Sequence, residues 1–81
     1  MYIIYGKRQC PFCSKAVELL QKRGFDFIYT SMDNREDELV EMALKYKHKT
    51  VPLIIQVVNG EPVFIGGYDN LCAWIEPMTE H

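Results

Sequence analysis

The sequence predicts a single α/β domain with a four-stranded mixed sheet flanked by three helices, in the order β-α-β-α-β-β-α. Its 81 residues suit one small domain, which we expect to span residues 1–81. Strand-length apolar runs alternate with helical patterns in the first half, and a β-α-β unit of this kind implies parallel strands. The Asn59-Gly60 pair between two further runs is the strongest two-residue hairpin signal and implies an antiparallel pair.

The first β-α-β unit covers the N-terminal third of the chain. Residues 1–5 are a short run rich in tyrosine and isoleucine, which predicts a strand. We expect a helix to begin at Cys10-Pro11, because proline suits the first helical position, and to stop at Gly24. The side-chain pattern of residues 25–29 alternates with the period of a strand, which predicts the second strand. The apolar face of the helix is expected to carry Cys13, Ala16, Val17 and Leu20.

A second helix is predicted over residues 35–46. The preceding residues 31–34, with the sequence Ser-Met-Asp-Asn, are suited to capping its N-terminus. Acidic side chains in its first turn and lysines near its end complement the helix dipole. The apolar side of this helix is expected to carry Leu39, Ala43 and Tyr46.

The C-terminal third predicts a hairpin followed by a last helix. Residues 53–58 are almost wholly apolar, as expected for a central buried strand, and residues 61–65 return as its partner. A glycine pair then interrupts the pattern, after which Asp69 or Asn70 can cap the last helix. That helix is expected to carry Leu71, Trp74 and Ile75 and to be limited by Pro77.

The composition is that of an ordinary soluble globular protein. Apolar residues make up 48% and charged residues 25%, and the formal net charge is −2. This charge gives no global electrostatic reason to expect nucleic acid or an anionic membrane as a partner. No apolar run approaches the ~20 residues of a membrane span, and the run at residues 1–5 is too short for a signal peptide. We therefore expect a cytoplasmic protein.

The chain has three cysteines, an odd and small number that does not suggest a secreted disulfide scaffold. Two of them form a C-P-F-C stretch at residues 10–13. Structural zinc needs four ligands, and the chain offers this pair, a distant Cys72 and two histidines without pair spacing. A structural disulfide across so short a loop would remove little chain entropy. We therefore favour a redox-active pair and expect no metal or organic cofactor.

Their positions give the two thiols different expected roles. A helix N-terminus offers unpaired N–H groups and a partial positive charge, which favour the thiolate form of Cys10. Lys7 and Arg8 lie just upstream and add positive potential. Cys13 is one turn further on, on the apolar face, so we expect it to be the less exposed thiol. Cys10 would attack a disulfide, and Cys13 would resolve the resulting mixed disulfide.

Three stretches together resemble the glutaredoxin family of the thioredoxin-like superfamily. Residues 7–13, K-R-Q-C-P-F-C, resemble the K-x-x-C-P-[YF]-C active site of glutaredoxins. Residues 50–52, T-V-P, are similar to their T-V-P segment, and residues 66–69, G-G-Y-D, to their G-G-x-D segment. Their order and spacing match over nearly the whole chain. The resemblance implies a thioredoxin-like fold and a small dithiol glutaredoxin, which reduces protein disulfides and glutathionylated thiols with glutathione as co-substrate.

The resemblance also implies a glutathione site. Lys7 would pair with a glutathione carboxylate, Cys10 would form the mixed disulfide, and Phe12, where tyrosine is commoner, would line the groove. The backbone of Val51, before a proline expected to be cis, would pair with glutathione like an added strand. N–H groups at the start of the last helix would hold the γ-glutamyl carboxylate, and Asp69 would accept from the ammonium. The full implied set is Lys7, Cys10, Phe12, Thr50, Val51, Pro52, Gly67, Tyr68 and Asp69.

The resemblance implies ribonucleotide reductase as a protein substrate, and we expect a monomer. Two alternatives stay open. A small redoxin that is reduced by thioredoxin reductase would lack the full glutathione site, and Lys7 and Asp69 argue against it. A protein that carries an iron–sulfur cluster between two subunits typically has a single active-site cysteine, and Cys13 and Pro11 argue against it.

Some residues near these motifs have ordinary expected roles. His48 is expected to face solvent, because no acid or nucleophile lies at an adjacent spacing. Cys72 is expected to be a small, half-buried residue of the last helix. The family often has an arginine or glutamine on or after the second helix as a further carboxylate contact, and only Lys47 and Lys49 offer themselves as substitutes here.

Overall fold

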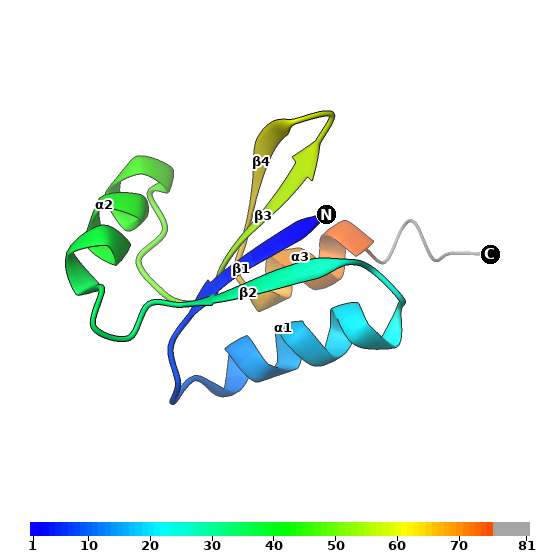
Figure 1. Ribbon diagram of the computed structural model, residues 1–81, viewed down its shortest axis with the longest axis horizontal. Helices are drawn as coiled ribbons and strands as arrows, with labels where there is room; N and C mark the ends of the chain where they lie inside the picture. Colours follow the sequence, from blue (N-terminus) through cyan, green and yellow to red (C-terminus); the bar gives the residue numbers. More distant parts are fainter. Residues whose placement is uncertain (76–81) are drawn as a thin grey trace.

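The structure is a computed structural model of the chain, and it describes residues 1–75. A four-stranded mixed sheet with the strand order β2-β1-β3-β4 forms its centre (Figure 1). β1 (Tyr2–Gly6) pairs in parallel with β2 (Phe27–Ser31) and antiparallel with β3 (Leu53–Val58). β3 in turn pairs antiparallel with β4 (Glu61–Gly66). The predicted mixed sheet, with its parallel first pair and its antiparallel hairpin, is confirmed.

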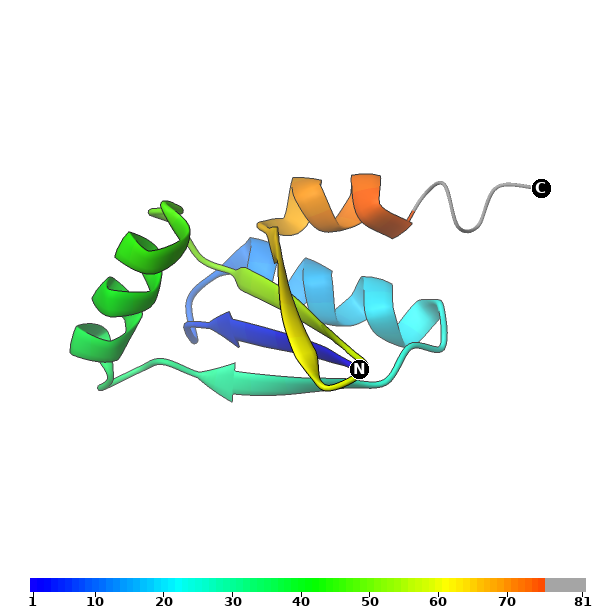
Figure 2. The same ribbon diagram turned by 90° about the horizontal axis from the view of Figure 1, so that it is seen from above.

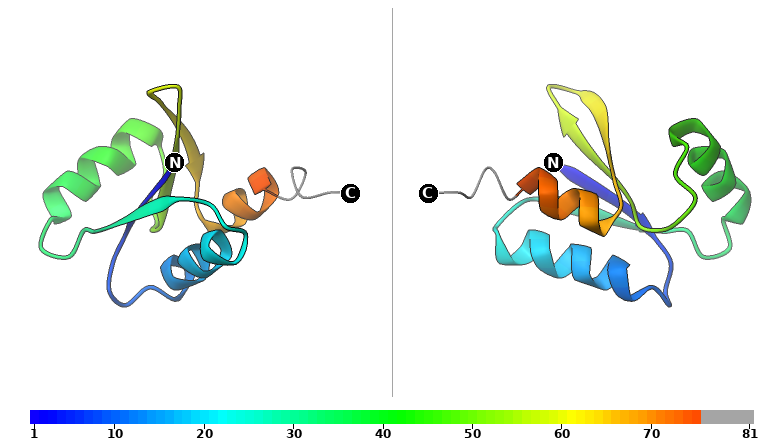
Figure 3. Two further views of the ribbon diagram at one scale, coloured as in Figure 1. Left: turned by 45° about the vertical axis from the view of Figure 1, so that its right-hand side comes forward. Right: turned by 180° about the vertical axis from the view of Figure 1, so that it is seen from behind.

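Two helices, α1 (Pro11–Lys22) and α3 (Tyr68–Ile75), cover one face of the sheet, as Figures 2 and 3 show. The predicted apolar stripe of α1 is turned inward, and its members Cys13, Ala16 and Leu20 are buried. The hydrophobic core lies between this face and the two helices. It consists of Tyr2, Ile4, Ala16, Leu20, Ile54, Leu71 and Ile75.

The remaining helix, α2 (Glu36–Tyr46), lies beyond the carboxyl ends of β1 and β2 (Figures 1 and 2). The Tyr46 ring stacks on Phe64 of β4, with the ring centroids 4.5 Å apart. α2 contains no fully buried side chain, and Leu44 is 74% exposed. No helix in the described part of the chain has the length and hydropathy needed to cross a membrane. The predicted apolar side of α2 is half-buried, at Leu39, Ala43 and Tyr46.

The second strand begins two residues later than the alternation predicts. Gly24 adopts a left-handed conformation (φ 76°) at the end of α1, and the Phe25 N–H donates to the Leu20 carbonyl at 3.0 Å. The Phe25 ring then packs edge-to-face on Tyr2, with the centroids 5.4 Å apart. Phe25 therefore completes the end of the helix instead of opening the strand, because its tertiary contact outweighs the local pattern.

The predicted cap of α2 is wrong. The residue at the N-cap is Arg35, which makes no side-chain capping bond, and Asn34 has a positive φ of 66°. The Asp33 carboxylate instead accepts from the Ser31 hydroxyl at 2.6 Å and from the Arg8 backbone N–H at 3.0 Å. These bonds hold the pKa of Asp33 below its ordinary value. The polar segment after β2 therefore anchors the loop that leads into α1.

Leu20 of α1 is buried and Leu44 of α2 is exposed, so their truncation should change the free energy of unfolding by different amounts. Leu20→Ala should lower the free energy of unfolding by about 2–5 kcal/mol, because Leu20 is 0% exposed and its removal leaves a cavity. The matched variant Leu44→Ala should stay within about 0.5 kcal/mol of the parent, because Leu44 is 74% exposed. Urea unfolding followed by circular dichroism measures both. Equal losses would contradict this assignment of the core.

Candidate active site

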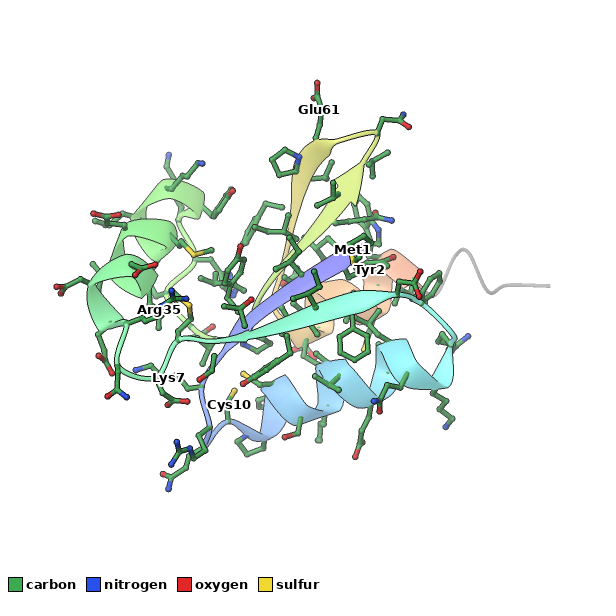
Figure 4. The ribbon with its side chains drawn as sticks, in the orientation of Figure 1. Met1, Tyr2, Lys7, Cys10, Arg35 and Glu61 are labelled. Carbon is green, nitrogen blue, oxygen red and sulfur yellow. The ribbon has the colours of Figure 1, made fainter. Side chains whose placement is uncertain are left out.

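Four segments of the chain meet at one end of the sheet (Figure 3). They are the loop after β1, the N-terminus of α1, the segment before β3 and the N-terminus of α3. Figure 4 shows Cys10 at the start of α1, with Lys7 on the loop before it and Arg35 beyond. The Val51-Pro52 peptide bond is cis, as the resemblance implies. The Cys10 thiol donates to the Val51 carbonyl at 3.7 Å, and this contact joins the N-terminus of α1 to the segment before β3.

Cys10 occupies the N-cap of α1, and proline takes the first helical position, as predicted. Its backbone is extended (φ −139°, ψ 100°), and its Sγ accepts from the Cys13 N–H at 3.2 Å. The side chain is 9% exposed. The sulfur thus accepts one of the N–H groups that a helix leaves free at its start. A thiolate at this position is stabilised by that N–H and by the helix dipole.

Cys13 is the more deeply buried thiol, as predicted, at 1% exposed. Burial raises its pKa to about 12, and its hydrogen bond to Cys10 acts in the same direction. Cys13 is therefore a neutral thiol near pH 7. The two cysteines therefore differ, since Cys10 Sγ accepts an N–H of the helix and Cys13 is enclosed and protonated.

A groove with a volume of about 400 Å³ opens beside Cys10. Phe12 lies on one wall, with its ring centroid 6.0 Å from that of Tyr68 on α3. Lys7 and Cys10 do not line this groove, although Cys10 contacts it through Val51. Seven of the nine residues in the implied set line it, and two residues outside that set join them. The lining residues are Phe12, His48, Thr50, Val51, Pro52, Gly67, Tyr68, Asp69 and Asn70.

The N-terminus of α3 forms the far end of the groove. The helix begins at Tyr68, and the Leu71 N–H donates to the Gly67 carbonyl at 2.9 Å. The predicted cap at Asp69 or Asn70 is therefore wrong, because both lie inside the first turn. Asn70 reaches back instead, and its Oδ1 accepts from the Gly67 N–H at 3.0 Å. The N–H groups that follow remain free of intrahelical partners and can receive an anion.

His48 is half-buried in the groove lining, so the prediction that it faces solvent is wrong. Its ring packs edge-to-face on Phe64 (5.6 Å between centroids), and its Nε2 lies 3.4 Å from Thr50 Oγ1. A β-carbon on Gly67 would lie 3.3 Å from Nε2. The sequence carried a signal for this placement, because alternate residues of an extended segment share a side and His48 is two positions before Thr50. Neither of its lysine neighbours lines the groove.

Lys7 lies on the loop between β1 and α1 (Figure 4), and its side chain is 37% exposed. Its Nζ is 4.0 Å from Glu36 Oε2 at the start of α2. The loop is fixed by the bond from the Arg8 N–H to Asp33. The geometry thus places the ammonium beside the site but outside the groove lining, and its pairing with a glutathione carboxylate stays a prediction.

The third cysteine, Cys72, lies on α3 and is half-buried, as predicted. Its thiol contacts the Tyr68 hydroxyl and raises the pKa of that phenol. Within residues 1–75, no three histidine, cysteine, aspartate or glutamate side chains gather closely enough to hold a metal ion.

Comparisons with known proteins agree with this geometry. The family model named Glutaredoxin matches residues 2–63. A glutaredoxin from Pseudomonas aeruginosa is 38% identical over 71 residues, which are 88% of this chain and 80% of that protein.

Two solved structures have the same arrangement of elements. The solution structure of a dithiolic glutaredoxin from Trypanosoma brucei brucei superposes with a TM-score of 0.76 at 32% identity, over 95% of this chain and 78% of that one. A buckwheat glutaredoxin superposes with a TM-score of 0.77 at 20% identity, over 95% and 69% of the two chains, and at that identity it supports the fold alone. The fold is thioredoxin-like, and the chain belongs to the glutaredoxin family.

Proposed function

We propose that the protein is a glutathione-dependent thiol–disulfide oxidoreductase, which reduces protein disulfides and glutathionylated thiols. Membership of the glutaredoxin family supports the thiol–disulfide chemistry. The observation that carries the glutathione dependence is the groove beside Cys10, which ends at the free N–H groups of α3. A groove with the Cys10 sulfur next to its Val51 wall and an anion site at the start of α3 fits a small acidic thiol peptide.

In the first step, the Cys10 thiolate attacks one sulfur of a substrate disulfide. A bond forms between Cys10 Sγ and that sulfur, the substrate S–S bond breaks, and the second substrate sulfur leaves as a thiolate that takes a proton. The Cys13 N–H, which is 3.2 Å from Cys10 Sγ, stabilises the attacking thiolate. The product is a mixed disulfide on Cys10.

The mixed disulfide can be resolved by two routes. In the dithiol route, Cys13 loses its proton, bonds to Cys10 Sγ and releases the reduced substrate thiol. Two glutathione molecules then reduce the Cys10–Cys13 disulfide and leave as glutathione disulfide. In the monothiol route, Cys10 carries a glutathionyl group and a second glutathione removes it directly, so that Cys13 takes no part.

Glutathione would lie in the groove with its cysteine sulfur at Cys10. Its backbone would pair with the exposed backbone of Val51, and its γ-glutamyl carboxylate would meet the N–H groups at the start of α3. Asp69, which is exposed in the first turn of that helix, would accept from the γ-glutamyl ammonium. The buckwheat glutaredoxin, which has the same fold, was solved as a complex with glutathione.

Glutathione acts here as a co-substrate, and the proposed chemistry uses no metal or organic cofactor. The proposed protein substrates are disulfide-containing or glutathionylated proteins. Ribonucleotide reductase is included among them on the basis of the family resemblance. The proposed setting is a reducing compartment such as the cytoplasm, where a dithiol of this kind is regenerated by glutathione.

The first experiment compares two reducing systems on one small glutathionylated disulfide. Glutathione with glutathione reductase and NADPH should support rapid NADPH consumption, and thioredoxin reductase with NADPH should not. Consumption only with thioredoxin reductase would contradict the proposal and would identify a redoxin of the alternative kind, in which the groove does not serve glutathione.

Removing each active-site sulfur in turn should separate the two routes. Cys10→Ser should lose at least about a thousandfold in both activities, because no nucleophile remains at the N-cap. Cys13→Ser should keep the reduction of glutathionylated thiols and lose the dithiol reduction of proteins. The two activities are measured with a glutathionylated peptide and with a protein disulfide. Loss of both activities in Cys13→Ser would show that Cys13 does more than resolve.

The anion end of the groove can be tested at Asp69. Asp69→Asn should raise the KM for glutathione roughly tenfold with little change in kcat, because a charge-assisted bond to the ammonium is lost in substrate and transition state alike. The matched control is Asp37→Asn in the first turn of α2, which lies outside the groove and should leave both constants unchanged. An unchanged KM in Asp69→Asn would remove this carboxylate from the site.

A further inference from the structure

The resolving cysteine forms part of a second groove, on the opposite flank of α1 from the first. This groove has a volume of about 570 Å³, and residues of α1 and of the edge strand β2 line it. Its lining includes the apolar side chains Val17 and Phe27, together with Cys13 and Tyr29. The two active-site thiols therefore lie next to different grooves, because Cys10 contacts the first groove through Val51 and Cys13 lines the second.

Tyr29 and Cys13 share the space above Gly6. A β-carbon on Gly6 would lie 2.6 Å from Cys13 Sγ and 3.0 Å from the Tyr29 hydroxyl oxygen, so both atoms lie against the same backbone. The hydroxyl donates to the Lys7 carbonyl at 3.2 Å, which holds the ring in place. Tyr29 pairs with Ile4 across the parallel ladder, so its side chain is on the α1 face of the sheet. Tyr29 itself is 39% exposed, whereas the thiol beside it is 1% exposed.

The charged groups around this pair are few. Asp33 lies after β2, Lys7 and Arg8 lie on the loop before α1, and Glu18 lies on α1 along the groove. Burial raises the pKa of Tyr29, and the neighbouring Cys13 and Asp33 raise it further, so the phenol is neutral near pH 7. A neutral aromatic side chain can exclude water from the sulfur without offering a cation that would stabilise its thiolate.

We propose that Tyr29 is a positioning residue that shields Cys13 from water, and that this shielding sets how turnover divides between the dithiol and monothiol routes. This inference rests on the proposed function. The Cys10 mixed disulfide is consumed either by Cys13 or by a second glutathione. Attack by Cys13 requires loss of the Cys13 proton to water, formation of the Cys13–Cys10 bond and departure of the substrate thiolate. Keeping water from the thiol slows the first of these events and favours the route through glutathione.

The test measures the reactivity of Cys13 without any glutathione. In a Cys10→Ser/Cys72→Ser background, Cys13 is the only cysteine of the chain, and its alkylation by iodoacetamide is followed from pH 6 to pH 10. With Tyr29 present, the rate should rise roughly tenfold for each pH unit without a plateau, because burial holds the pKa of Cys13 far above this range. With Tyr29→Leu, the rate at pH 8 should increase roughly tenfold or more, and a plateau should appear at lower pH.

Two further variants separate shielding from a loosened strand. Tyr29→Phe keeps the ring, so its profile should lie within about twofold of the parent. Ile28→Ala changes the same strand on its other face, where Ile28 is 50% exposed, and should leave the profile unchanged. Urea unfolding confirms that each variant is folded, and Tyr29→Ser replaces any Tyr29→Leu protein that is not. An unchanged profile in the Leu and Ser variants, or an equal change in Ile28→Ala, would overturn the proposal.

A second measurement connects the shield to turnover. In a Cys72→Ser protein with glutathione bound to Cys10 as a mixed disulfide, release of glutathione reports closure by Cys13. Tyr29→Leu should release it several-fold faster than the parent, and equal or slower release would contradict the assigned role in partitioning. The shielding of Cys13 could hold while the proposed function fails, because the alkylation profile does not depend on which reductant reduces Cys10.

Discussion

The packing of the Cys13 sulfur against the backbone of Gly6 is the contact on which the site depends. Gly6 is the last residue of β1 and is buried, and a β-carbon there would lie 2.6 Å from the sulfur. No side chain other than hydrogen fits at that distance, so the first turn of α1 can approach the end of β1 only over a glycine. This approach leaves Cys10 at the N-cap, where its sulfur accepts the Cys13 N–H.

The same contact makes the two thiols unequal. Residues one helical turn apart at the start of a helix would ordinarily share the favourable effect of its dipole. Here Cys10 Sγ receives the hydrogen bond from the helix, whereas Cys13 is enclosed by Gly6, Tyr29 and the core, and burial raises its pKa to about 12. The difference between the thiols therefore arises from which one faces the sheet, and the sequence alone places them only one turn apart.

The sequence is sufficient for those parts of the fold in which local pattern and tertiary packing agree. Proline after Cys10 predicted the start of α1, and Asn59-Gly60 predicted the hairpin, in which both residues have positive φ (53° and 82°). Where a distant contact competes with the local pattern, the prediction is wrong. Phe25 leaves the predicted strand because its ring packs on Tyr2.

The candidate site also contains residues that the sequence predicts and residues that it does not. The residues that line the groove through the T-V-P and G-G-Y-D segments could be predicted, because their roles depend on backbone that those motifs specify. The expected position of His48 is wrong although its spacing from Thr50 carried a signal, since its placement also depends on the turn at Lys47, a non-glycine residue with a φ of 55°. Asp33 belongs to the segment predicted to cap α2, yet it accepts from the Arg8 N–H, 25 residues earlier in the chain. The motif residues act through backbone groups that their own motif specifies. His48 and Asp33 instead make contacts with segments that are distant in the sequence.

The arrangement of the two grooves has a chemical consequence. A disulfide exchange enzyme must bind a reductant next to its nucleophile while its resolving thiol waits without reacting with that reductant. Here α1 places the two thiols at different surfaces, because the groove beside Cys10 faces α3 and the groove beside Cys13 faces β2. A change to the β2 side can therefore alter the resolving step without touching the surface that we assign to glutathione. The N-terminus of α1 stabilises a thiolate at Cys10, and the same helix separates the groove beside Cys10 from the groove beside Cys13.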